Sequence, residues 1–139
     1  MNSAGERVLV LDASLNRRLA AELKGRGRAA ASAAELGMAR MSDPELLRGL
    51  TRRMGTQDWV LVTADDFLPA EQAGLVAELG MTVATVATGQ GQGRARGVDE
   101  ERHARETCHR WAHAMAGQRA GAVRRYSPSS NRAWSARVL

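Results

Sequence analysis

DWVLVT, at residues 58–63, is the segment that decides the fold class. Its apolar residues follow one another without alternation, which is typical of a strand buried on both faces of a parallel sheet. RVLVLD (7–12) repeats this pattern, and MTVATVAT (81–88) is predicted to be a third strand. Because the segments between these strands have helical patterns, we expect an α/β domain with a parallel sheet and right-handed crossovers.

The clearest helix lies at residues 42–55. Ser42 and Glu45 have the spacing of a capping box, Pro44 stands in the first turn, and Gly55 follows the last apolar position. Further elements are predicted by apolar spacing and terminal glycines: helices at 14–27, 69–80 and 98–117, and a short strand near 28–32.

The chain is expected to divide near residue 88. Residues 1–88 hold the predicted α/β core, and residues 89–139 hold a glycine-rich loop, a helix and a basic tail that we expect to pack on the same domain. The glycine-rich loop, GQGQGRARG (89–97), is interpreted as a hinge or a mobile loop. Beyond residue 117 no periodicity is sustained, so the tail is predicted to become ordered only when a partner binds.

Composition sets limits on the class of protein. The chain has 139 residues, 44% of them hydrophobic, which suits one domain with a real core. Cys108 is the single cysteine and cannot form an internal disulfide, and no window approaches the roughly 20 apolar residues of a membrane helix. We therefore expect a cytoplasmic protein without membrane attachment and without an export signal.

Charge is distributed unevenly along the chain. Residues 1–93 carry ten basic against eleven acidic side chains, whereas residues 94–139 carry ten against four. Such a basic C-terminal part indicates a polyanion or an acidic protein as partner. Nineteen of the twenty basic residues are arginine, which suits phosphate contacts but would also follow from a GC-rich genome.

Four aspartates are predicted to gather at one edge of the sheet. Asp12 ends the first strand, Asp65 and Asp66 follow the second, and Asp43 stands at the start of a helix that opens onto the same edge. Crowded carboxylates repel one another unless a hard cation such as Mg²⁺ or Mn²⁺ neutralises them. Each acid also has a structural alternative: Asp43 as a helix cap, Asp12 in a turn with Ser14, and the other two as loop acids.

Three segments resemble the successive motifs of the PIN-like ribonucleases, in particular the short branch of VapC-type toxins from bacterial toxin–antitoxin pairs. They are VLDASL (10–15), ELGMARMSDPELL (35–47) and WVLVTADDF (59–67), and the resemblance runs from about Val8 to Val86. It implies a PIN-like three-layer sandwich with a central, mainly parallel sheet, here with a basic helical C-terminal extension.

The resemblance also implies a function and a site. The function is that of a Mg²⁺- or Mn²⁺-dependent endoribonuclease, the toxin of a type II toxin–antitoxin system, with RNA as substrate. Asp12, Asp43 and Asp65 would bind the metal, and Asp66 would be a further catalytic acid. Glu35 and Thr63 are second-tier candidates. The implied partner is a cognate antitoxin, and the implied assembly is a homodimer or a toxin–antitoxin hetero-oligomer.

Two departures from the family pattern favour an alternative. The family often has D-E-N-L-P at the first strand, where this chain has Asp12-Ala13-Ser14-Leu15-Asn16, and its last acidic motif is one residue longer than T-A-D-D-F. The alternative is a catalytically inactive PIN-like module that binds RNA or a protein. A phosphoacceptor receiver domain would need a lysine after a late strand, but the only lysine lies in the first predicted helix, at Lys24.

Two further clusters have competing interpretations. Glu106, His109 and His113 share one face of the helix at 98–117, with Cys108 nearby, which suits either a zinc site or a partner-facing surface. In the tail, cations alternate with aromatic residues, as in proteins that bind single-stranded nucleic acid, although a solvated tail or an antitoxin-binding segment would have the same composition. The residues of this second cluster are Arg124, Arg125, Tyr126 and Trp134.

Overall fold

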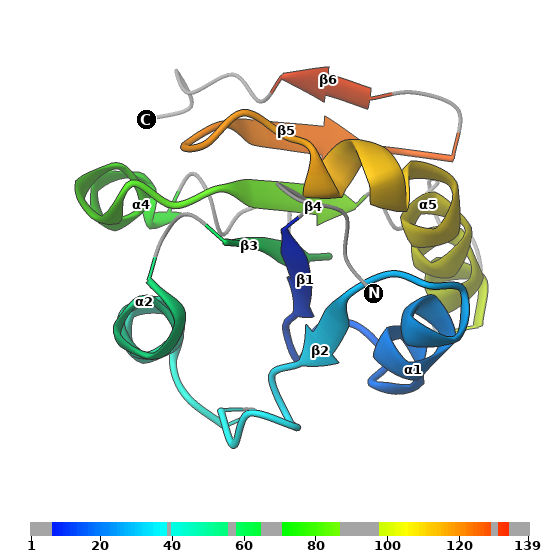
Figure 1. Cartoon of the computed structure of the whole chain (residues 1–139), viewed down its shortest axis with the longest axis horizontal. Helices are drawn as coiled ribbons and strands as arrows, with labels where there is room; N and C mark the ends of the chain where they lie inside the picture. Colours follow the sequence, from blue (N-terminus) through cyan, green and yellow to red (C-terminus); the bar gives the residue numbers. More distant parts are fainter. Residues whose placement is uncertain are drawn as a thin grey trace.

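The computed structural model describes residues 7–38, 40–55, 58–64, 71–86, 98–128 and 131–133. These form one six-stranded sheet in the order β2-β1-β3-β4-β5-β6, with helices on both faces (Figure 1). The strands are β1 (Val8–Leu11), β2 (Ala30–Ser32), β3 (Trp59–Thr63), β4 (Val83–Val86), β5 (Val123–Tyr126) and β6 (Asn131–Ala133). The helices are α1 (Arg18–Gly25), α2 (Asp43–Met54), α4 (Ala73–Leu79) and α5 (Val98–Ala116). The predicted α/β class with a mainly parallel sheet is confirmed, since β1 to β5 are parallel and β6 is antiparallel.

The two central strands are β1 and β3, which pair with Leu9 opposite Val60 and Leu11 opposite Val62. Every residue of β3 is buried, as the uninterrupted apolar run predicted. Alternate residues of β1 enter different cores: Leu9 and Leu11 face one layer of helices, and Val10 faces the other. The sheet is therefore the middle layer of three.

One outer layer consists of α1 and α5, and the other consists of α2 and α4 (Figure 1). Leu19 and Leu23 of α1 share a core with Cys108 and Met115 of α5. On the opposite face, Leu47 and Leu50 of α2 share a core with Val76 of α4. No helix among the described residues is long and apolar enough to cross a membrane.

The crossover through α5 differs in hand from the others. The path from β1 to β2 uses the α1 face, and the paths from β2 to β3 and from β3 to β4 run the opposite way and use the other face. These three connections consequently share one hand. The path from β4 to β5 crosses the sheet in the same direction as the paths from β2 to β3 and from β3 to β4. Its helix, α5, nevertheless lies on the other face, beside α1. Parallel connections are almost always right-handed. The β4–β5 connection has the opposite hand to the other three, so the expectation of right-handed crossovers throughout is wrong.

The segment after α5 is not the tail that was predicted. Val123–Tyr126 is the fifth parallel strand, and Asn131–Ala133 pairs with it. Tyr126 is 1% exposed, and its hydroxyl donates a 2.7 Å hydrogen bond to Gln118 Oε1. Gln118 Nε2 in turn donates to the carbonyl of Val83 on β4 at 3.1 Å. The predicted helix at 98–117 is confirmed as α5, which covers the sheet, whereas the predicted basic tail is corrected, because β5 and β6 widen the sheet.

Two helix starts show how side chains set the boundaries. Ser42 and Glu45 form the predicted capping box, in which the Glu45 carboxylate accepts the Ser42 N–H at 2.9 Å. The first helix starts later than predicted, at Arg18, because residues 12–17 form a turn at the end of β1. Asn16 supports that start, since its side-chain oxygen accepts the Arg18 N–H at 2.8 Å.

Candidate functional site

The site lies where the chain changes direction across the sheet. Neighbouring strands β1 and β3 lead away to opposite sides, β1 to β2 and β3 to β4, and to helices on opposite faces. In open parallel sheets, ligands bind outside the carboxyl ends of the strands at such a switch point. The residues directly after β1 and β3 are Asp12 and Ala64. They define the candidate site.

Asp12 is held firmly at the end of β1. Its backbone N–H donates to the carbonyl of Val62 on β3 at 3.0 Å, which continues the strand pairing by one residue. Its side chain accepts the Ser14 N–H at 2.9 Å and also a hydrogen bond from the Ser14 hydroxyl. The residue is 6% exposed. A carboxylate in this position has a fixed orientation.

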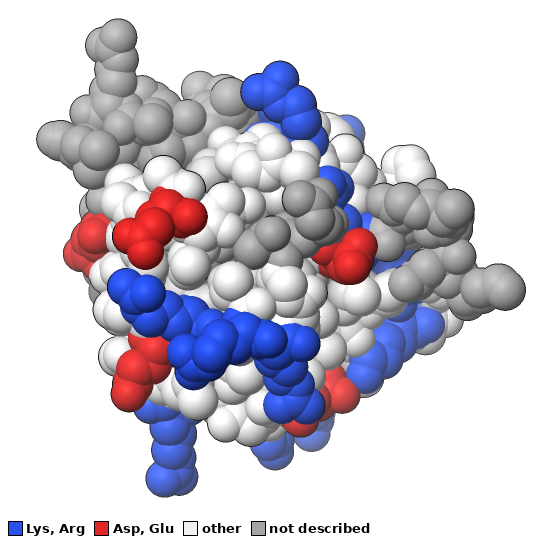
Figure 2. All heavy atoms as spheres, turned by 60° about the vertical axis from the view of Figure 1, so that its left-hand side comes forward, with Lys and Arg blue, Asp and Glu red and all other residues white. Residues whose placement is uncertain are grey.

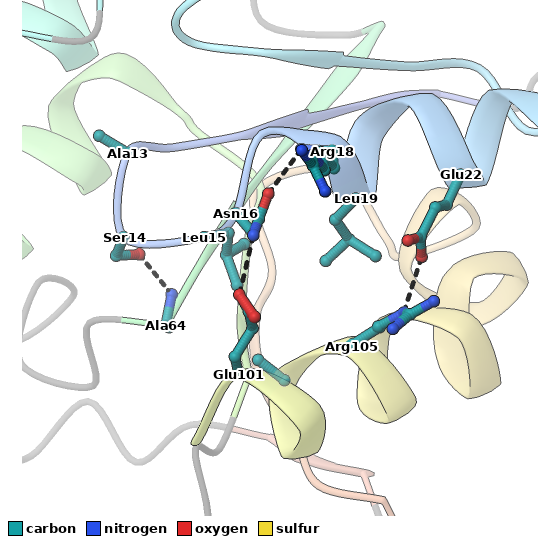
Figure 3. Close-up of a pocket in the computed structure, with 11 residues that line it drawn as sticks. Ala13, Ser14, Leu15, Asn16, Arg18, Leu19, Glu22, Ala64, Glu101 and Arg105 are labelled. Atoms are coloured by element: carbon teal, nitrogen blue, oxygen red, sulfur yellow. Dashed lines mark hydrogen bonds and ion pairs between the residues drawn. The ribbon is translucent and has the colours of Figure 1, made fainter. Parts of the chain in front are cut away.

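Ser14 links the ends of the two strands. While bonded to Asp12, its hydroxyl oxygen accepts the Ala64 N–H at 2.9 Å (Figure 3), and it lies 3.3 Å from the Thr63 hydroxyl oxygen. Thr63 is fully buried as the last residue of β3. Ser14 and Thr63 therefore position Asp12 at the switch point.

Asp43 approaches the same place from α2. As the first residue of that helix it is half-buried, and it makes no hydrogen bond or ion pair with any described residue. Ser42 and Glu45 already satisfy the capping box. Asp43 is thus not needed as a cap, which removes the structural alternative that the sequence left open.

The two carboxylates influence one another. Burial raises the pKa of Asp12 above its ordinary value of 3.8, and the negative charge of Asp43 raises it further. The hydrogen bonds from Ser14 and Thr63 lower this pKa in part. Burial and a like charge both disfavour the ionised form of a carboxyl, so this pair is better tolerated beside a cation.

The donor atoms suit a hard divalent cation. Carboxylate oxygens are the preferred protein ligands of Mg²⁺ and Mn²⁺. Among the described residues, no group of three or more acidic, histidine or cysteine side chains could hold a metal ion. Asp65 and Asp66, the other predicted acids, lie outside the described residues and follow Ala64 directly. Asp12 and Asp43 are the two predicted metal ligands that the structure describes, and the metal site itself stays a prediction.

A cavity of about 550 Å³ opens on the α1 and α5 side of this edge. Ser14 and Ala64 line one end of it, and the N-terminal halves of α1 and α5 form its walls (Figure 3). Asn16 Nδ2 donates to Glu101 Oε2 at 2.8 Å across the cavity mouth, and Arg105 Nε donates to Glu22 Oε1 at 2.9 Å farther along. The loop that holds Asp12 thus separates the carboxylates from a polar cavity.

Glu35 is placed away from the acids. It lies in the turn after β2, where its carboxylate accepts the Ser32 N–H at 2.9 Å and pairs with Lys24 at 2.8 Å. The hydrogen bond from Lys24 is the main reason that its pKa is lowered. This carboxylate stabilises a turn, and the structure gives no contact between it and Asp12 or Asp43.

The helix cluster does not form the zinc site that was considered. Cys108 is fully buried in the core, where burial raises the pKa of its thiol to about 12, whereas Glu106 and His113 are exposed. His109 Nε2 lies 2.9 Å from Glu22 Oε1. Cys108 and the two histidines therefore lie on different faces of α5.

The predicted aromatic and basic cluster of the tail is largely corrected. Tyr126 is buried between the sheet and α5 and cannot stack on a base, and burial raises its pKa to about 12. Arg124 and Arg125 are half-buried residues of β5. Trp134 lies outside the described residues. For the residues of this cluster that the structure describes, a tail in which exposed aromatic and basic side chains alternate to bind single-stranded nucleic acid is excluded.

The sequence reasoning missed the polar lining of the cavity. Glu22, Glu101 and Arg105 belong to two helices that are far apart in sequence, so only the packing of α1 against α5 shows that they meet. Asn16 had a detectable signal, because Asn two residues before a helix often accepts a backbone N–H. The role of Ser14 as a link to Ala64 had no signal, since it depends on the pairing of β1 with β3.

Comparisons of the chain with protein-family models, with curated proteins and with solved structures give no match. The resemblance to PIN-like ribonucleases consequently stays a prediction from the motif segments.

Proposed function

We propose that this chain is a Mg²⁺- or Mn²⁺-dependent endoribonuclease with a PIN-like fold, the toxin of a type II toxin–antitoxin pair. The observation that supports this most is that Asp12, at the switch point between β1 and β3, is near enough to Asp43 for the charge of Asp43 to raise its pKa. These two acids come from separate motifs, about thirty residues apart, and neither is required by a helix cap.

In this proposal Asp12 and Asp43, together with Asp65, hold the cation, and Asp66 is a further acid of the site. When bound, a divalent cation supplies positive charge that activates water and stabilises the charge of a phosphodiester under attack. The chain's own contribution is orientation: Ser14 and Thr63 fix the Asp12 carboxylate, and burial keeps bulk water from it.

A metal titration tests the site. A ligand at ten times its dissociation constant stabilises a folded protein by about 1.4 kcal/mol. Saturating Mn²⁺ should therefore raise the unfolding free energy of the wild type, and Asp43→Asn should abolish the gain. Asp58→Asn, which changes an exposed carboxylate before β3, is the matched control and should keep it. An equal gain in wild type and Asp43→Asn would remove the basis for the site.

One observation favours a second candidate function, an inactive PIN-like module that binds RNA or a protein. Asp12 already accepts two hydrogen bonds from Ser14, as an aspartate with a purely structural role in a turn would. Ala13 also stands where the resembled family often has a second acid. RNA binding without cleavage in the presence of Mn²⁺ would favour the inactive module over the ribonuclease.

The proposed partner is an antitoxin, and the proposed assembly is a homodimer or a toxin–antitoxin hetero-oligomer in the cytoplasm. The resemblance is the basis of this part of the proposal, and the basic excess of residues 94–139 supports an acidic partner. Co-expression with the product of an adjacent gene, followed by size-exclusion chromatography, tests it. A chain that stays monomeric and unbound would contradict it.

A further inference from the structure

A second concavity, of about 410 Å³, lies along the outer side of α5 and is strongly basic. Four arginines and one glutamate line it, together with His109 and Pro128; the charged residues are Arg26, Arg102, Arg105, Glu106 and Arg110. Those from α5 are Arg102, then the adjacent Arg105 and Glu106, then Arg110; spacings of three and four residues relate Arg102 to that pair and Glu106 to Arg110, so they lie on one side of the helix. Arg26 comes from the end of α1 and closes the other side.

Two of these arginines are available to a ligand. Arg26 and Arg102 are exposed and make no hydrogen bond or ion pair with any described residue. Arg105, by contrast, pairs with Glu22 at 2.9 Å, and the Arg110 guanidinium lies 5.2 Å from the centre of the Trp111 ring. A ligand with negative charges at intervals could therefore engage Arg26 and Arg102 without breaking existing pairs.

His109 adds a polar group to the same concavity. Its side chain is 15% exposed, and its Nδ1 atom is buried without a hydrogen-bond partner among the described residues. Buried ring nitrogens normally have a partner, and those that lack one in the folded protein are often completed by a ligand or by water. The concavity is thus basic, and one ring nitrogen of a residue in its wall has no hydrogen-bond partner among the described residues.

The concavity adjoins the polar cavity that lies beside the candidate site. Arg105 lines both cavities, and α1 and α5 run in the same direction, as shown by the successive pairs Asn16–Glu101 and Glu22–Arg105. Arg18 lines the cavity near Ser14, and Arg26 lies about 12 Å farther along α1 at 1.5 Å per residue. An extended ligand could follow this path to the end of β1.

We propose that this path, from Arg18 past Arg105 to Arg26 and Arg102, binds the phosphate backbone of a single-stranded RNA. The inference rests on the proposed ribonuclease function and names how its substrate is held. Guanidinium groups bind phosphate through paired N–H donors. The carboxylates at the edge repel a polyanion, so a substrate there needs a basic surface beside the site, and this path supplies one. An acidic protein could bind this path without extending to the carboxylates, whereas a substrate must extend to them.

The test is RNA binding without cleavage. Fluorescence anisotropy with a labelled single-stranded RNA of mixed sequence is measured in EDTA at several salt concentrations. Each phosphate contact to a single strand contributes about 0.7 to the slope of log K against log salt. The double variant Arg26→Gln/Arg102→Gln should therefore reduce the slope by about 1.4 if each arginine neutralises one phosphate.

The matched control uses arginines on the opposite face. Figure 2, which brings the α2 and α4 side forward, shows that basic side chains also gather there, and the exposed arginines of α2 include Arg48 and Arg52. Arg48→Gln/Arg52→Gln removes the same charge, and we expect its slope to equal that of the wild type. Equal loss in both double variants would overturn the path, because it would indicate attraction by net charge alone.

Two more outcomes separate this inference from the proposed function. If Arg26→Gln/Arg102→Gln binds RNA like the wild type but loses binding to an acidic peptide, the path is a protein-binding surface and the inference is wrong. If the wild type binds RNA with the expected slope but does not cut it with Mn²⁺, the path stands and the nuclease proposal fails.

Discussion

Replacing Ser14 with alanine should destabilise the protein, and more so at neutral pH than in acid. The Ser14 hydroxyl donates to the Asp12 carboxylate and accepts the Ala64 N–H, so the change removes both hydrogen bonds and leaves the Ser14 backbone bond in place. A hydrogen bond to a charged group contributes about 1.5–3 kcal/mol and a neutral one about 1 kcal/mol. Because Ser14 itself is exposed and water can replace part of these bonds, we expect a loss of roughly 2 kcal/mol.

The pH dependence follows from Asp12. Its pKa is raised in the folded protein, so the folded state binds more protons than the unfolded chain above the ordinary value of 3.8, and stability falls as the pH rises through this window. The Ser14 hydrogen bond lowers that pKa in part. Without it the pKa rises further, and the difference in unfolding free energy between wild type and Ser14→Ala grows as the pH increases above 3.8.

Urea denaturation at acidic and neutral pH measures this difference. Thr51→Val is the control, because it removes a hydroxyl that donates to the Leu47 carbonyl within α2 and bonds no other described residue, and its effect should not depend on pH. A loss below about 0.5 kcal/mol at both pH values, against the 1 kcal/mol typical of one hydrogen bond, would refute the link between Asp12, Ser14 and Ala64.

Three further predictions concern other parts of the fold. Ser42→Ala removes the capping box of α2, in which Ser42 and Glu45 bond each other's backbone, and should lower the unfolding free energy by about 1 kcal/mol in urea denaturation. Tyr126→Phe leaves the buried Gln118 oxygen without its donor and should lower the unfolding free energy by about 1–3 kcal/mol. The same change at an exposed tyrosine in a solvated tail would leave the unfolding free energy unchanged. Cys108 should resist iodoacetamide in the native protein and react once urea unfolds it, since burial keeps its thiol inaccessible and raises its pKa to about 12; rapid native labelling would contradict its place in the core.

The central part of the fold was predictable because local and tertiary preferences agree there. The apolar runs of β1 and β3 are long enough to identify strands buried on both faces, and the capping box fixes the start of α2. The predicted short strand near residues 28–32 is confirmed as β2, and the strand at 81–88 as the shorter β4. Asp12 follows β1 directly, and the charge of Asp43 at the start of α2 reaches it, whereas the metal-binding role of the two acids stays a prediction.

The C-terminal strands were not predictable by the same signals. β5 has only four residues, two of them arginines, and it forms because β4 offers an edge with which Val123 and Tyr126 can pair. Tyr126 of this strand is buried because α5 packs over it. The periodicity of the sequence does not indicate that α5 lies beside α1. Gly121, with φ of +81°, allows the turn before β5 and was the available signal.

The most direct test of the central claim is cleavage of total RNA by the purified chain, free of any partner protein, with Mg²⁺ or Mn²⁺. We predict cleavage that disappears in EDTA and in Asp43→Asn and Asp65→Asn, and that survives in Asp58→Asn. Cleavage that persists in EDTA or in Asp43→Asn would contradict a site built on these carboxylates. A folded wild type that binds RNA and Mn²⁺ but leaves the RNA intact would contradict the nuclease.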